Sequence, residues 1–225
     1  NSILPIIAAT ILCPEPIIID NAPRLEDVEV ICKLLSELNC DVNISNVNDR
    51  LTINTKNIVE MDANEELMRK MRASFLIMGP MLARFGYCKL SLPGGCNIGS
   101  RPIDLHLKGF KLLGAEVVIG HGFVEVRAKK IVGNRIYLDF PSVGATENIM
   151  MVSVFAEGTT IIENAAEEPE IWDLAQFLNK MGAKIEGAGF GKITITGVKN
   201  LKGISYTPIY DLSLIHISDG AREAC

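Results

Sequence analysis

The chain has 225 residues, of which 48% are hydrophobic and 22% are charged, so it holds enough apolar material for the core of an ordinary globular protein. Its net charge of -5 argues against a general nucleic-acid surface, because phosphate binding by counterion release needs clustered lysine and arginine. No apolar run reaches the roughly 20 residues that span a bilayer, so we expect a soluble protein without a nucleic-acid or membrane partner.

The six cysteines form no CxxC pair and follow no regular spacing. They therefore indicate neither a zinc site nor a disulfide framework, and a reducing cytoplasm fits them best. The chain begins without methionine or a charged leader, so we expect no signal peptide and a truncated N-terminus.

A unit of helix, strand, helix, strand and strand recurs three times, at a spacing of roughly 70 residues. The apolar periodicity predicts the first unit as helix 2–12, strand 16–20, helix 25–38 and strands 41–44 and 50–54. The second is helix 63–85 with a kink at Gly79-Pro80, strand 88–92, helix 102–113 and strands 116–119 and 123–128. The third is helix 145–156, strand 159–163, helix 169–181 and strands 184–186 and 192–196, with a bridging strand at 135–139. The first helices are mostly apolar, which is typical of helices surrounded by protein.

The second helix of each unit has similar start and stop signals. An aspartate lies near each start, where a carboxylate complements the helix dipole, and a residue suited to a left-handed backbone lies near each end. These residues are Asp27, Asp104 and Asp173 at the starts, and Asn39, Gly114 and Gly182 at the ends. The loop before the helix-start aspartate is longest in the second unit, so we expect that unit to carry function.

This long loop, at residues 93–104 of the stretch 91–106, is rich in glycine and carries one cysteine, Cys96. The glycines give the backbone freedom to hold the thiol at a surface. The helix that follows favours anions at its start and lowers the pKa of a nearby thiol. Arg101 lies at that start, where a cation is normally disfavoured, so its position indicates an anionic ligand.

The loop resembles the active-site signature of the UDP-N-acetylglucosamine enolpyruvyl transferases, the first committed enzymes of bacterial peptidoglycan synthesis. The matching residues are Leu92-Pro93-Gly94-Gly95-Cys96, Ile98-Gly99, Arg101-Pro102 and Asp104-Leu105-His106. Further matches lie at residues 71–74, 79–80, 83–86, 142–146 and 156–166.

The resemblance implies an α/β fold, the inside-out α/β barrel of enolpyruvyl transferases, in which each of two lobes contains three such units. We expect residues 1–211 to form one lobe, with repeats at about 1–58, 63–128 and 145–197. Residues 212–225 resemble the translation of a sequencing adaptor, so they are left out of the fold.

The resemblance also implies roles for individual residues. Cys96 would protonate the methylene carbon of phosphoenolpyruvate or capture it as a covalent adduct, and Asn1 matches a residue of phosphoenolpyruvate binding. Arg72 matches a substrate-contacting arginine, and Arg101 would hold a phosphate group. The positions expected to shape the uridine and diphosphate site are Pro102, Ile103, Asp104, Leu105, Ser142 and Val143.

The implied reaction transfers the enolpyruvyl group of phosphoenolpyruvate to the 3'-hydroxyl of UDP-N-acetylglucosamine, with no metal or organic cofactor. The family's carboxylate base and a phosphate-binding arginine would lie in the second lobe, and its lysine before Asn1 is missing, so we expect this chain alone to be inactive. Two alternatives stay open. One is a related transferase acting on shikimate 3-phosphate, which lacks the cysteine loop, and the other is a non-catalytic nucleotide-sugar binding module.

Three other features have simpler interpretations. His106 has no second histidine or carboxylate at a catalytic spacing, so we expect a packed helix histidine. Residues 187–192 are glycine-rich but lie between two strands without a following helix, which predicts a β-turn. Structural roles are expected for Cys13, Cys32, Cys40 and Cys88.

Overall fold

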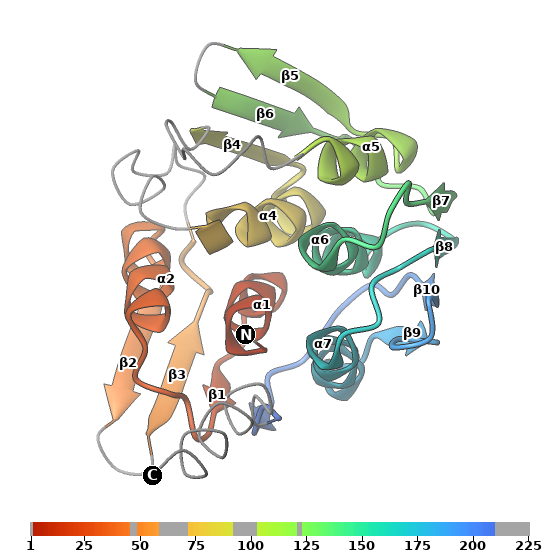
Figure 1. The fold of residues 1–225 in the computed structure, drawn as a ribbon. Helices are drawn as coiled ribbons and strands as arrows, with labels where there is room; N and C mark the ends of the chain where they lie inside the picture. The colour runs from red at the N-terminus through yellow and green to blue at the C-terminus, as the bar shows by residue number, and fades with distance from the viewer. Residues whose placement is uncertain (1, 46–48, 59–71, 92–102, 121–122, 210–225) are drawn as a thin grey trace, which may run out of the picture.

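The computed structural model describes residues 2–45, 49–58, 72–91, 103–120 and 123–209. Figure 1 shows three small β-sheets at the periphery and the helices between them. This is the predicted α/β arrangement, with each sheet covering helices on its inner face.

The first unit matches the prediction element by element. It consists of helix α1 (Ile3–Ala9) with the 3-10 turn η1 (Thr10–Leu12), strand β1 (Ile17–Ile19), helix α2 (Glu26–Glu37) and strands β2 (Asp41–Ser45) and β3 (Arg50–Asn54). Helix α2 buries Val28, Ile31, Leu34 and Leu35, at the spacing of one helix face.

The second unit begins differently from the prediction. Instead of one kinked helix, the described part is a 3-10 helix η2 (Arg72–Ile77) followed by helix α4 (Met78–Phe85), and residues 63–71 lie outside the described chain. Pro80 lies in the first turn of α4, where its missing N–H costs no helical hydrogen bond. The unit continues with β4 (Tyr87–Ser91), α5 (Asp104–Leu112), β5 (Glu116–Gly120) and β6 (Phe123–Arg127).

The third unit follows the prediction closely. Strand β7 (Arg135–Tyr137) precedes α6 (Val143–Ser153), β8 (Thr159–Glu163), α7 (Pro169–Met181), β9 (Lys184–Glu186) and β10 (Lys192–Thr196). Between β9 and β10 the glycine-rich segment forms the expected turn, in which the Phe190 N–H donates to the Gly187 carbonyl at 3.2 Å.

The three sheets share one pairing rule. In each unit the first and second strands both pair antiparallel with the third, in the orders β1-β3-β2, β4-β6-β5 and β8-β10-β9. Strand β7 adds to the third sheet parallel to β8. The sequence did not predict strand β11 (Ser205–Tyr206), which adds parallel to β1 and so joins the end of the described chain to its beginning.

Helix α6 is buried along nearly its whole length. Residues 145–153 are all buried, whatever side of the helix they occupy, and the helix contacts α4, α5 and α7. The expectation of a helix surrounded by protein is confirmed. No helix within the described ranges has the length and apolar character required to cross a membrane.

The predicted helix ends are confirmed, because Asn39, Gly114 and Gly182 all have positive φ angles. One predicted start was wrong. Asp173 is the fifth residue of α7 and fully buried, so it lies too deep to complement the dipole at the first turn.

The Asp173 carboxylate instead binds the returning C-terminal segment. It accepts hydrogen bonds from the Tyr206 hydroxyl at 2.6 Å and from the Ile209 N–H at 3.1 Å. The Tyr206 ring packs edge-on against Phe177, with ring centroids 5.3 Å apart. Asp173 therefore anchors the segment that closes the three units into a ring.

Tyr206→Phe should lower the free energy of unfolding by about 1–2 kcal/mol, because it leaves a buried carboxylate with one donor fewer. Urea denaturation of the 225-residue chain would measure the change. The matched control is Tyr137→Phe, since Tyr137 is 58% exposed and its change should stay within about 0.5 kcal/mol. Equal effects in both variants would contradict the anchoring role.

Candidate active-site end of the helices

The described α-helices all begin at the same end of the molecule. In each unit the first helical segment finishes just before the first strand, at Leu12, Phe85 and Ser153. The second helix finishes just before the second strand. The first and second strands both run antiparallel to the third strand between them, so they start at the same edge of the sheet, and both helices of a unit finish there. Helices α1, α6 and α7 are seen nearly end-on in Figure 1. We call the end formed by residues 20–25, 103–105, 138–144 and 164–169 the helix-start end.

The helix-start end is suited to binding anions, but the individual helix starts differ in how well they can do so. A helix start carries about half a positive charge and several N–H groups without helical acceptors. The second helices α2, α5 and α7 already have acidic residues in the first turn, whereas α1, α4 and α6 have none. The starts of α1 and α4 are buried, and in α4 the Gly79 N–H already donates to Asn148 Oδ1, so among the described helices the start of α6 is the one left for a bound anion.

The start of α5 carries three of the predicted site residues. Ile103 precedes the helix, Asp104 is its exposed first residue, and Leu105 has a side chain only 4% exposed. The Leu105 side chain belongs to the core, so its main-chain N–H is the group left for a ligand. The Leu107 N–H donates to the Ile103 carbonyl at 3.1 Å, so the N–H groups before it have no acceptor among the described residues of α5.

The start of α6 carries two more of the predicted site residues, Ser142 and Val143. Ser142 is the N-cap, and its hydroxyl accepts a long hydrogen bond from the Ala145 N–H at 3.4 Å. The Thr146 N–H donates to the Ser142 carbonyl at 2.9 Å. The N–H groups of Val143 and Gly144, both partly exposed, have no hydrogen-bond acceptor among the described residues. A main-chain N–H gives an apolar residue such as Val143 a means to bind an anion.

The two helix starts touch each other. A Cβ atom placed on Gly144 would lie 3.4 Å from Cε1 of His106 and 3.6 Å from its Nε2. His106 is the third residue of α5, and burial lowers the pKa of its imidazole to about 4. The prediction of a packed helix histidine is confirmed, and this packing brings residues 103–105 next to residues 142–144.

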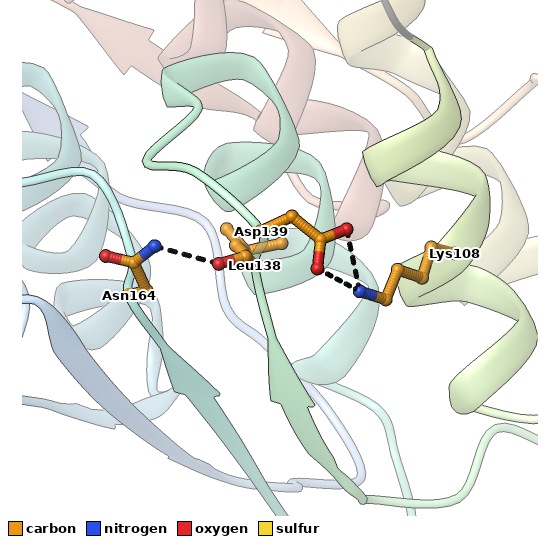
Figure 2. A network of polar contacts seen from close by, with 4 residues as sticks. All are labelled: Lys108, Leu138, Asp139 and Asn164. Atoms are coloured by element: carbon orange, nitrogen blue, oxygen red, sulfur yellow. Dashed lines mark hydrogen bonds and ion pairs between the residues drawn. The ribbon is translucent and has the colours of Figure 1, made fainter.

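An exposed ion pair also connects α5 with the segment that precedes α6, as Figure 2 shows. Lys108 Nζ on α5 lies 2.8 Å and 2.9 Å from the two carboxylate oxygens of Asp139. Asn164 Nδ2, from the loop after β8, donates to the Leu138 carbonyl at 2.8 Å. An exposed ion pair contributes little stability, so its effect here is to direct the segment that leads into α6.

Sequence reasoning missed Lys108, Asp139 and Asn164. Asn164 could have been found from the repeat, because an asparagine follows the first strand in both the first and the third unit, at Asn21 and Asn164. Both residues have a φ of 55° in the structure. Nothing in the sequence pattern pairs Lys108 with Asp139, which are 31 positions apart.

The remaining predicted residues are only partly described. Arg72 begins η2, and its side chain lies outside the description. Asn1, Cys96, Arg101 and Pro102 lie outside the described residues altogether. Their roles stay predictions from the resemblance.

The other cysteines are structural, as predicted. Cys13, Cys32, Cys40 and Cys88 are free and buried. Burial raises the pKa of Cys32 to about 11 and that of Cys40 to about 12, and it also raises the pKa of Cys13 and Cys88. These thiols stay protonated and unreactive at neutral pH. Within the described ranges, His, Cys, Asp and Glu side chains form no group of three or more that could hold a metal.

Glu147 is an unusual residue near this end. It lies on α6 with 4% exposure, and burial, together with the nearby carboxylates of Glu170 and Glu168, raises the pKa of its carboxyl to about 8. The group is therefore largely protonated at neutral pH and adds little negative charge to the helix starts.

The sequence profile of the family described as EPSP synthase (3-phosphoshikimate 1-carboxyvinyltransferase) matches residues 1–214. UDP-N-acetylglucosamine 1-carboxyvinyltransferase 2 of Clostridium tetani is 62% identical over 211 residues, which are 94% of this chain and 51% of that protein. UDP-N-acetylglucosamine 1-carboxyvinyltransferase 1 of Clostridium acetobutylicum is 63% identical over 211 residues, 94% of this chain and 50% of that protein. The chain thus spans about half the length of the curated relatives it matches.

Solved structures show the same fold. The enolpyruvyl transferase NikO from Streptomyces tendae superposes with a TM-score of 0.84 at 20% identity, over 95% of this chain and 51% of that chain. EPSP synthase from Acinetobacter baumannii gives a TM-score of 0.68 at 16% identity, over 92% of this chain and 48% of that chain. The predicted fold class, one lobe-like set of three repeated units, is confirmed by these similarities.

Glu147→Gln should flatten the loss of stability at alkaline pH. Folding raises the pKa of this carboxyl from 4.5 to about 8, so the folded state favours the neutral acid. The resulting stabilisation is complete below the unfolded pKa and is lost as the pH rises through the folded pKa. Urea denaturation at pH 5 and pH 9 should therefore show a larger fall in unfolding free energy for the unmodified chain than for the variant, by more than about 1 kcal/mol.

The control is Glu157→Gln, because the Glu157 side chain is 65% exposed. It should leave the pH dependence unchanged. Parallel pH profiles for the unmodified chain and Glu147→Gln would show that the carboxyl is not held in its neutral form.

Proposed function

We propose that this chain, which belongs to the EPSP synthase family of carboxyvinyltransferases, is one half of a UDP-N-acetylglucosamine 1-carboxyvinyltransferase. Two relatives that carry this name are 62% and 63% identical to it over 94% of its length. The observation that carries the proposal structurally is the pair of touching helix starts, α5 and α6, which present main-chain N–H groups at an end suited to phosphates.

The proposed reaction moves the enolpyruvyl group of phosphoenolpyruvate to the 3'-hydroxyl of UDP-N-acetylglucosamine and releases phosphate, by addition and elimination through a tetrahedral intermediate. Both substrates are phosphorylated, so the common direction of the helices supports their binding. We assign the reaction to the first committed step of peptidoglycan synthesis, and a cytoplasmic location stays a prediction.

In this proposal the described residues bind the nucleotide sugar. The N–H groups of Val143 and Gly144, at a helix start without an acidic residue, hold the diphosphate. The start of α5 binds the uridine, with the Asp104 carboxylate accepting hydrogen bonds from the uracil or ribose. Ile103 and Val143 supply apolar contact for the uridine. These roles need no side-chain acid or base, which fits the apolar character of the site.

The chemistry is assigned to residues outside the described ranges. Cys96 is proposed as the acid or covalent residue at the phosphoenolpyruvate carbon, with Arg101, Arg72, Pro102 and Asn1 around the two ligands. The base that takes the hydroxyl proton is proposed to lie in the other half of the parent polypeptide. Residues 1–211 would then form one lobe, and residues 212–225 would add nothing to it.

One alternative is transfer to shikimate 3-phosphate, the reaction in the family profile's description. The cysteine loop and the names of the curated relatives favour the nucleotide sugar instead. A binding module without catalysis is the other alternative, and turnover separates it from the proposal.

A fusion protein tests the proposal. Residues 1–211 would be joined to the half of the Clostridium tetani protein that this chain does not match. We expect the fusion to release phosphate when given phosphoenolpyruvate and UDP-N-acetylglucosamine together, and the 225-residue chain alone to release none.

Cys96→Ser in the fusion should lower the rate by about a hundredfold or more, as loss of a positioned acid does. A folded fusion that accepts shikimate 3-phosphate and rejects the nucleotide sugar would overturn the proposal. So would a fusion that binds the nucleotide sugar without any turnover.

A further inference from the structure

We infer that Asn148 and His106 are positioning residues that hold the starts of α5 and α6 at the spacing needed to bind the nucleotide sugar. The identity of the ligand in this inference rests on the proposed function. The contacts of Asn148 and His106 do not depend on that function. Neither residue is assigned a part in the reaction.

Asn148 is fully buried in the middle of α6 and contacts three other elements. Its Oδ1 accepts the Gly79 N–H of α4 at 2.7 Å, and its Nδ2 donates to the Phe75 carbonyl of η2 at 2.9 Å. The same Nδ2 lies 3.1 Å from Nδ1 of His106 on α5. One amide therefore links η2, α4, α5 and α6.

These contacts fix the tautomer of His106. The Asn148 oxygen is occupied by an N–H donor, so the nitrogen faces both the Phe75 carbonyl and the imidazole. A nitrogen that donates to the imidazole requires Nδ1 to be an acceptor, which puts the proton on Nε2. The lowered pKa of about 4 keeps this neutral form at physiological pH.

His106 transmits the constraint to the helix starts. Its ring meets Phe75 edge-on, with centroids 5.9 Å apart, and its Cε1 and Nε2 lie against Gly144 in the first turn of α6. A movement of the ring would therefore move α5 relative to the Val143 and Gly144 N–H groups.

The packing around Asn148 leaves no room for adjustment. A Cβ atom on Gly79 would lie 2.6 Å from the Asn148 carbonyl oxygen and 2.7 Å from its Oδ1. A side chain on Gly109 would collide with Ile149 in the same way, with its Cβ 2.4 Å from Cδ1. Helices α4 and α5 thus both approach α6 at glycine, and the polar contacts at Asn148 decide their register.

The test compares substitutions of His106 in the fusion protein. His106→Asn keeps an acceptor near the Nδ1 position, whereas His106→Leu keeps the bulk but removes the acceptor. We expect His106→Leu to raise KM for UDP-N-acetylglucosamine by about tenfold, as an unsatisfied buried donor does, with kcat changed much less. His106→Asn should restore KM to within about threefold of the parent.

His106→Gln is the second variant, for the case in which His106→Leu does not fold. Its polar group lies near the Nε2 position, so KM should rise as it does for leucine. Lys111→Ala, on the last turn of α5, is the matched control and should leave KM unchanged. An unchanged KM in the leucine or glutamine variant would overturn the inference, and so would an equal loss of kcat in all His106 variants.

A measurement on the 225-residue chain separates this inference from the proposed function. Nitrogen NMR of labelled histidine should show His106 neutral at pH 6, with the proton on Nε2. A proton on Nδ1 would overturn the inference even if the fusion is active. An inactive fusion with the expected tautomer would instead count against the proposed function.

Discussion

The burial of α6 constrains the rest of the structure. The polar side chains of a helix enclosed by protein can pair only with protein groups, because water cannot reach them, and in α6 the Ser153 hydroxyl is left without a partner among the described residues. Thr146 accepts the Ala166 N–H at 3.1 Å, and Asn148 links to Gly79, Phe75 and His106. The neighbouring elements are thereby held in fixed register to one helix, whose partly exposed first residues, Val143 and Gly144, lie at the candidate site.

The common direction of the helices explains how the same scaffold can bind phosphorylated ligands. Three repeated units place their helix starts at one end, and the chain's own carboxylates occupy the starts of α2, α5 and α7. The starts of α1 and α4 are buried, so the start of α6, which has no acidic residue, is the one of the described starts that is open to an anion from outside. Because β11 runs parallel to β1, the segment that follows β11 also returns to this end.

Much of the fold was predictable because its signals are local. Apolar periodicity and left-handed residues such as Asn39 and Gly182 located nearly every helix and strand. The misses came from longer-range effects. Strand β11 is too short to show an apolar period, and it forms because it can pair with the edge of β1. Asp173 was predicted as a helix-start residue, but it accepts a hydrogen bond from Tyr206, 33 positions away. The site residues at 103–105 and 142–143 were predicted from the resemblance. They are proposed to bind mainly through main-chain N–H groups, which leave no pattern in the sequence. The polar residues Thr146 and Asn148 within an apolar helix were the available signs of the buried network.

The most direct test of this account is an amide NMR titration of the 225-residue chain with UDP-N-acetylglucosamine. The account predicts that the largest chemical-shift changes occur at the main-chain N–H groups of Asp104, Leu105, Val143 and Gly144, which lie in the first turns of α5 and α6. Changes centred on the glycine-rich turn at residues 187–191, or no changes in these two helix turns at saturation, would contradict it.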